Sequence, residues 1–120
     1  MTIQIETEAN GLLNVRISNL ITREDVFQCQ EAIVAAIKLY GKVKALVVLE
    51  AFQGWETSDE WVDFLFYAEY ENKIEKIAVT GDLKWRDDMF AFLSGPFRSG
   101  LIEFFNPSKE SEARTWLEVN

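Results

Sequence analysis

The chain has 120 residues, and its 12 basic and 20 acidic side chains give a formal charge of -8 at pH 7. This charge repels the phosphate backbone of nucleic acids and anionic membrane surfaces, so neither is expected as a partner. Hydrophobic residues make up 48% of the chain, which excludes disorder, and we expect a single domain over residues 1–120.

We expect a cytoplasmic protein, because no targeting or membrane segment is evident. The first residues, MTIQIETE, lack the basic and apolar regions of a signal peptide. No apolar run approaches the roughly 18 residues that a membrane-spanning helix needs.

The chain contains no histidine. Histidine is the commonest general base and a frequent zinc ligand, so its absence removes Ser-His and Cys-His nucleophiles. The single cysteine, Cys29, cannot form an internal disulfide, and we expect it to pack as a small core side chain. These features favour binding over catalysis, so we predict no enzyme, no catalytic residue, no metal site and no cofactor.

The first predicted elements are two strands and a helix. Residues 3–8 and 12–18 alternate apolar and polar side chains, and Asn10-Gly11 between them predicts an antiparallel hairpin. Thr22 and Asp25 have the spacing of a capping box and predict the start of a helix that ends at Gly41. The apolar residues with helical spacing on this segment are Val26, Cys29, Ile33, Ile37 and Tyr40.

The rest of the chain alternates strands and helices. Residues 45–49, 76–80 and 101–105 predict three more strands, the first of them apolar on both faces. Helices are predicted over about 58–70, after Asp82, and after Asn106-Pro107. We expect Gly81 to permit the turn before the third helix, and Ala113, Trp116 and Leu117 to face inward on the last. The order predicts an α/β fold with a mixed five-stranded sheet, β-β-α-β-α-β-α-β-α.

The chain resembles the bacterial SpoIIAA-like family, which is related to STAS domains. The resemblance rests on this order of elements and on GDLKW after the fourth strand, GPF at 95–97, FFNP and EARTWL. It covers essentially the whole chain. It implies a five-stranded sheet wound as a β-α superhelix, in a cytoplasmic domain that usually lacks enzymatic activity.

In the STAS anti-sigma-factor antagonists, a kinase phosphorylates a serine or threonine at the start of the second helix. The positions that match here are Thr57 and Ser58, although AFQGWETSDEW departs from the Asp-Ser-Ser-Gly-Leu type of run. Neighbouring acidic residues would repel a phosphate. We therefore expect these two residues mainly to cap the helix.

Surplus apolar residues predict a binding surface on the second and third helices. Val62, Phe66 and Tyr70 lie four residues apart on a flank of the predicted second helix, and Phe90 is out of register on the third. A neighbouring helix, a second subunit or a small apolar ligand could cover them. We hypothesise an apolar pocket, roofed by a loop from Phe52 to Trp55. Its lining would be Trp61, Leu65, Phe66, Trp85, Met89 and Phe90.

Two further expectations concern the sheet. If every helix lies on one side of it, half of the apolar side chains of 45–49 need another cover, which favours a homodimer. Glu50 follows this strand, at an edge where α/β proteins place sites, but it is not chosen as a catalytic residue. Two functions stay open: regulatory protein interaction, and carriage of a small hydrophobic, lipid-like molecule between the second and third helices.

Overall fold

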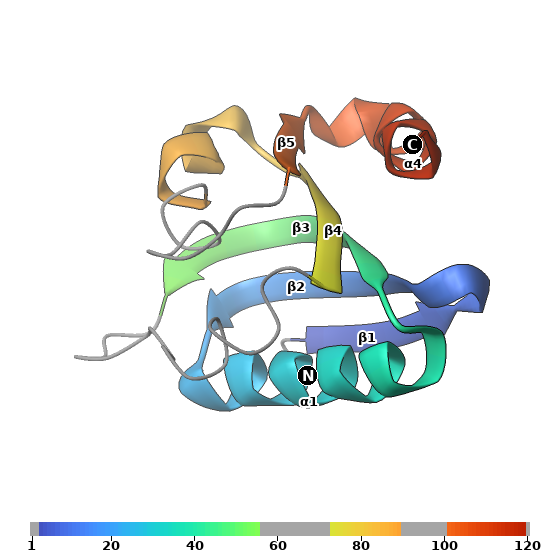
Figure 1. Ribbon diagram of the computed structural model, residues 1–120. Coiled ribbons are helices and arrows are strands. Elements are labelled where there is room, and N and C mark those ends of the chain that lie inside the picture. The colour runs from blue at the N-terminus through green and yellow to red at the C-terminus, as the bar shows by residue number, and fades with distance from the viewer. Residues whose placement is uncertain (1–2, 56–72, 90–100, 120) are drawn as a thin grey trace.

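The computed structural model describes residues 3–55, 73–89 and 101–119. A five-stranded sheet has the order β1-β2-β3-β4-β5, with β1 antiparallel to β2 and the other pairs parallel (Figure 1). This confirms the predicted mixed sheet with an N-terminal hairpin. The strands are β1 (Ile3–Glu8), β2 (Leu12–Ile21), β3 (Val43–Trp55), β4 (Ile74–Thr80) and β5 (Leu101–Phe105). The longer helices are α1 (Arg23–Tyr40) and α4 (Glu110–Glu118).

The hairpin between β1 and β2 forms where Asn10-Gly11 predicts it. Both residues have positive φ, 70° and 78°. The connection is a three-residue turn, Ala9–Gly11, because Glu8 pairs with Leu12. A Cβ atom at Gly11 would lie 2.9 Å from the carbonyl oxygen of Lys42, so glycine also allows this close approach.

Helix α1 begins and ends as predicted. The Thr22 Oγ1 accepts from the Asp25 N–H at 3.1 Å, and the Asp25 carboxylate accepts from the Thr22 N–H at 3.0 Å. The chain leaves the helix at Gly41, which has φ 87°. Of the apolar residues with helical spacing, Tyr40 lies in the last turn and is 41% exposed. Cys29 packs against the core, and burial raises the pKa of its thiol to about 11.

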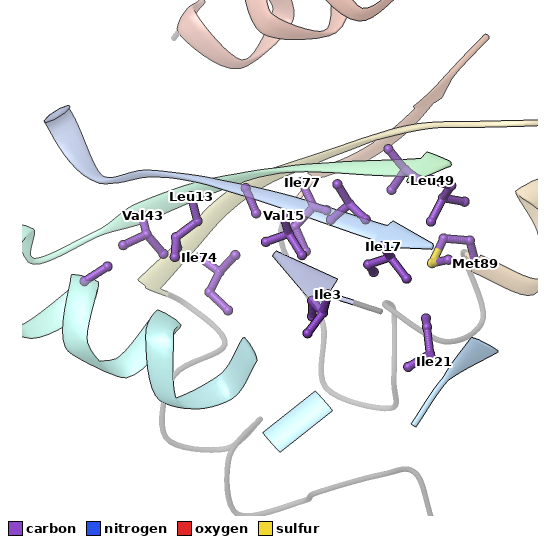
Figure 2. Close-up of a cluster of buried hydrophobic side chains, with 14 of the residues drawn as sticks. Ile3, Leu13, Val15, Ile17, Ile21, Val43, Leu49, Ile74, Ile77 and Met89 are labelled. Carbon is purple, nitrogen blue, oxygen red and sulfur yellow. The ribbon is translucent and has the colours of Figure 1, made fainter. Parts of the chain in front are cut away.

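The two faces of β3 are buried in different clusters. Ala45, Val47 and Leu49 join the cluster shown in Figure 2, which packs between the sheet and α1. Leu46 and Val48 face the other side, where they pack in a smaller cluster with two residues of α4. These are Ala113 and Leu117, 0% and 1% exposed, as the sequence predicted.

The homodimer was predicted on the condition that every helix lies on one side of the sheet. This condition does not hold for this part of the sheet. Helix α4 follows the last strand, so no crossover rule fixes its side, and it covers the face opposite α1. The buried side chains of β3 need no second copy.

Helix α4 is held at both ends. Asn106 Oδ1 accepts from the Ser108 N–H at 3.1 Å, and Pro107 begins a short 3₁₀ turn that leads into the helix. At the other end, Lys76 Nζ of β4 donates to the Trp116 carbonyl at 2.8 Å and to the Val119 carbonyl. A lysine that binds the last carbonyls of a helix also complements its dipole.

Candidate functional site

Three aromatic rings meet where β3 ends and the chain leaves β4. Phe52 and Trp85 have ring centroids 4.8 Å apart, Phe52 and Trp55 are 5.2 Å apart, and Trp55 and Trp85 are 6.0 Å apart. All three pairs are edge-to-face, the arrangement that the ring quadrupoles favour. We call these three residues the aromatic cluster.

Two irregularities at the end of β3 direct these rings to one side. In β2, successive residues of the series Ile17, Asn19 and Ile21 are two positions apart. Their partners in β3 are Leu49, Phe52 and Trp55, and these are three positions apart. Each step therefore includes one extra residue in β3.

The backbone at these steps adopts positive φ, which favours glycine. Ala51, in the first step, has φ 49°, and Gly54, in the second, has φ 109°. Without the extra residue at Ala51, strand alternation would direct Phe52 toward α4. The predicted loop from Phe52 to Trp55 is thus the irregular end of a strand.

The turn after β4 supports the third ring. The chain turns at Gly81 as predicted, although this glycine has no positive φ. A Cβ atom there would lie 2.9 Å from both Cβ and Cδ1 of Leu49, so close packing requires the glycine. Asp82 caps the turn as predicted, since its Oδ1 accepts from the Lys84 N–H at 3.0 Å. The Lys84 ammonium lies 5.5 Å from the centroid of the Trp85 ring.

The predicted site residues that the structure describes lie close together but differ in accessibility. Met89 is 1% exposed and Phe52 is 8% exposed, and both belong to the hydrophobic core. Trp55 and Trp85 are half-buried and pack against it. Of these four described residues, the two tryptophans offer surface to a ligand.

Leu83 was not predicted as a site residue. It lies in the turn two residues before Trp85 and is 54% exposed. An apolar residue after a capping aspartate, within a short turn, was the available signal.

Eight predicted site residues lie outside the described residues. They are Thr57, Ser58, Trp61, Val62, Leu65, Phe66, Tyr70 and Phe90. The pocket between the second and third helices and the phosphorylation positions therefore stay predictions.

Glu50, which follows the apolar run of β3, is engaged in an ion pair. Glu50 Oε1 accepts from Arg16 Nη1 at 2.7 Å, and this hydrogen bond raises the pKa of Arg16. Over residues 3–55, 73–89 and 101–119, no three Cys, Asp or Glu side chains are grouped so that they could hold a metal ion. In the same ranges, no helix is long and apolar enough to cross a membrane.

Comparisons with known proteins agree with this architecture. A family model described as SpoIIAA-like matches residues 12–118. Among solved structures, the chain is similar to an uncharacterized protein of the DUF3478 family with a SpoIIAA-like fold, from Shewanella loihica PV-4. The two share 20% identity with a TM-score of 0.66, over 96% of this chain and 91% of that one. At this identity the likeness concerns the fold. A search of the curated proteins finds no match.

Proposed function

The chain belongs to the SpoIIAA-like family, and we propose that it is a non-enzymatic, STAS-like module that regulates through contact with a partner protein. The contact surface is the aromatic cluster together with Leu83. The observation that carries this proposal is the fixed placement of two half-buried tryptophans beside an exposed leucine.

Physical reasons favour this surface as a contact site. Aromatic side chains are enriched at protein interfaces, where tryptophan often contributes most of the binding energy. The rings of Trp55 and Trp85 are already held edge-to-face, so little conformational entropy is lost when a partner binds. The lack of histidine in the whole chain supports contact over acid–base chemistry.

Site-specific photocrosslinking tests the proposal. A photoreactive residue is placed at Leu83 and, as a matched control, at Glu112, which is exposed on α4. A regulatory module should form one specific crosslink in cells from position 83 and none from position 112. The crosslinked protein is then purified and its binding measured with the Leu83→Asp variant, which changes an exposed side chain and should leave the fold intact. Equal crosslinking from both positions contradicts the proposal.

Carriage of a small hydrophobic molecule is the second candidate function. It is favoured by the continuity of the half-buried tryptophans with Met89 and the core. The cluster also follows the carboxyl ends of parallel strands, where α/β proteins place ligand sites. Native mass spectrometry of the purified protein should then show a retained apolar molecule, and Trp85→Phe should retain less of it. A carrier gives this added mass without a crosslink from Leu83, whereas a regulator gives the crosslink without the added mass.

A further inference from the structure

A hollow lies at the opposite end of the parallel strands from the aromatic cluster. It has a volume of about 540 Å³ and lies between the hairpin turn, the starts of β3 and β4, and the second half of α4. Pockets that bind small molecules span roughly 300–1,000 Å³, so the hollow is large enough for one. Its charged lining residues are Glu8, Lys42, Lys44, Glu75, Arg114 and Glu118.

One pair of these charges is already satisfied. Arg114 Nη1 and Nη2 donate to the two oxygens of Glu8 at 3.3 Å and 2.9 Å, a two-point contact that fixes both side chains. The Glu8 carboxylate also accepts from the Asn14 amide at 3.3 Å. This pair forms a neutral part of the wall.

The remaining charges have both signs and do not pair directly. Lys42 lies immediately before β3 and Lys44 is its second residue, and both line the hollow. Glu75 comes from β4 and Glu118 from α4. Among the ion pairs of the described residues, none includes any of these four side chains. The hollow therefore holds two ammonium groups and two carboxylates that form no direct ion pair, and the charge of Arg114 attracts that of Glu118.

Apolar side chains complete the lining. Leu12 is half-buried at the start of β2 and offers surface to a ligand, whereas Leu117 of α4 is 1% exposed and offers almost none. A ligand here would meet an apolar surface between charges of opposite sign. A simple anion would be repelled by Glu75 and Glu118, and a simple cation by Lys42 and Lys44.

We propose that this hollow binds a free amino acid with an apolar side chain. Its carboxylate contacts Lys42 and Lys44, its ammonium group contacts Glu75 and Glu118, and its side chain packs against Leu12. This site is separate from the aromatic cluster, so the proposal stands or falls independently of the function proposed above.

Ligands that differ only in charge test the proposal. The ¹⁵N-labelled protein is titrated with leucine, with N-acetyl-leucine, which lacks the ammonium group, and with leucinamide, which lacks the carboxylate. Leucine should give saturable chemical-shift changes around Lys44 and Leu117. Each analogue should bind about tenfold more weakly, because each loses one charged contact. No saturation with leucine overturns the proposal, and so does N-acetyl-leucine binding as tightly as leucine, which would indicate an anion site.

Variants then locate the site. Lys44→Gln and Glu118→Gln should each weaken leucine binding about tenfold. Both alter side chains at the surface, and the NMR spectrum of each variant reports whether it is folded. The control is Lys109→Gln, which removes an exposed lysine 3.5 Å from Glu112 and should leave leucine binding unchanged. Equal leucine affinity in wild type and in both site variants contradicts the proposal. That result is expected if Lys42 and Lys44 only complement the dipole at the C-terminal end of α1.

Discussion

Gly54 lies against the ring of Trp85. A Cβ atom at residue 54 would be 3.3 Å from Cη2 of Trp85, and the glycine has φ 109°. Replacing Gly54 with alanine therefore adds both backbone strain and a close contact. We expect Gly54→Ala to lower the free energy of unfolding by about 2–3 kcal/mol, measured by urea denaturation.

Gly41→Ala is the matched control for the contact. Gly41 has φ 87°, but a Cβ atom there would have no atom within 4 Å. This variant should lose only the cost of strain, about 1–2 kcal/mol. Equal losses in the two variants would show that packing against Trp85 contributes nothing.

Ala51 has an unfavourable backbone conformation at the first irregularity of β3, with φ 49°. Glycine adopts positive φ without the strain that a Cβ atom causes, although it costs entropy on folding. We expect Ala51→Gly to raise the free energy of unfolding by about 0.5 kcal/mol in the same urea assay. Ala35→Gly, at an exposed position inside α1, should instead lower it by about 1 kcal/mol. A loss at Ala51 as large as that at Ala35 would contradict strain at this residue.

Sequence reasoning succeeded where the determinant is local. The Thr22–Asp25 cap and the Asn10-Gly11 turn depend on residues within a few positions of each other, and both were confirmed. The end of β3 could not be predicted, because Phe52 and Trp55 do not follow strand alternation and an alanine gives no signal of positive φ.

The contacts of α4 were also beyond sequence reasoning. Lys76 lies 40 positions before Trp116, the residue whose carbonyl it binds, and only the folded arrangement brings them together. Of the hypothesised pocket, Phe52 and Met89 lie in the hydrophobic core and Trp85 packs against it, whereas the pocket itself stays a prediction. The exposure of Leu83 was not anticipated, because accessibility depends on neighbours from other elements.

Replacing Lys76 should loosen α4. Its ammonium group donates to two carbonyls at the end of the helix and lies 4.8 Å from the Trp116 ring centroid. Lys76→Met keeps much of the apolar stem but leaves these carbonyls without their donor. We expect a loss of about 1.5 kcal/mol and faster hydrogen exchange of the α4 amides.

Lys109→Met is the control, because its ion pair with Glu112 is exposed and lies on the first turns of the same region. Exposed pairs of this kind contribute little, so α4 should exchange as in the wild type. Unchanged exchange in Lys76→Met would show that the lysine does not hold the helix.

The Glu8–Arg114 ion pair should make the free energy of unfolding depend on pH in the acidic range. The hydrogen bond from Arg114 lowers the pKa of Glu8 below its ordinary value of 4.5. A carboxyl group whose pKa is lowered in the folded state stabilises the folded state at pH values above its ordinary pKa. This contribution is lost as the pH falls through the pKa of the folded state. Glu8→Gln should therefore show a smaller loss of unfolding free energy than the wild type between about pH 5 and pH 3.

The pH series needs a carboxylate outside this contact as its control. Glu112→Gln removes one 3.5 Å from the exposed Lys109. If the wild type, Glu8→Gln and Glu112→Gln all lose the same unfolding free energy as the pH falls, the Arg114 contact is not the source of the acid dependence.

The affinity of the purified partner, identified from position 83, tests the contact surface most directly. Titration calorimetry compares the wild type with Leu83→Asp and with Glu112→Lys on α4. We predict that Leu83→Asp weakens binding about tenfold or more and that Glu112→Lys changes it less than about twofold. Unchanged affinity in a folded Leu83→Asp variant would contradict the assignment of the partner surface to the aromatic cluster and its neighbouring leucine.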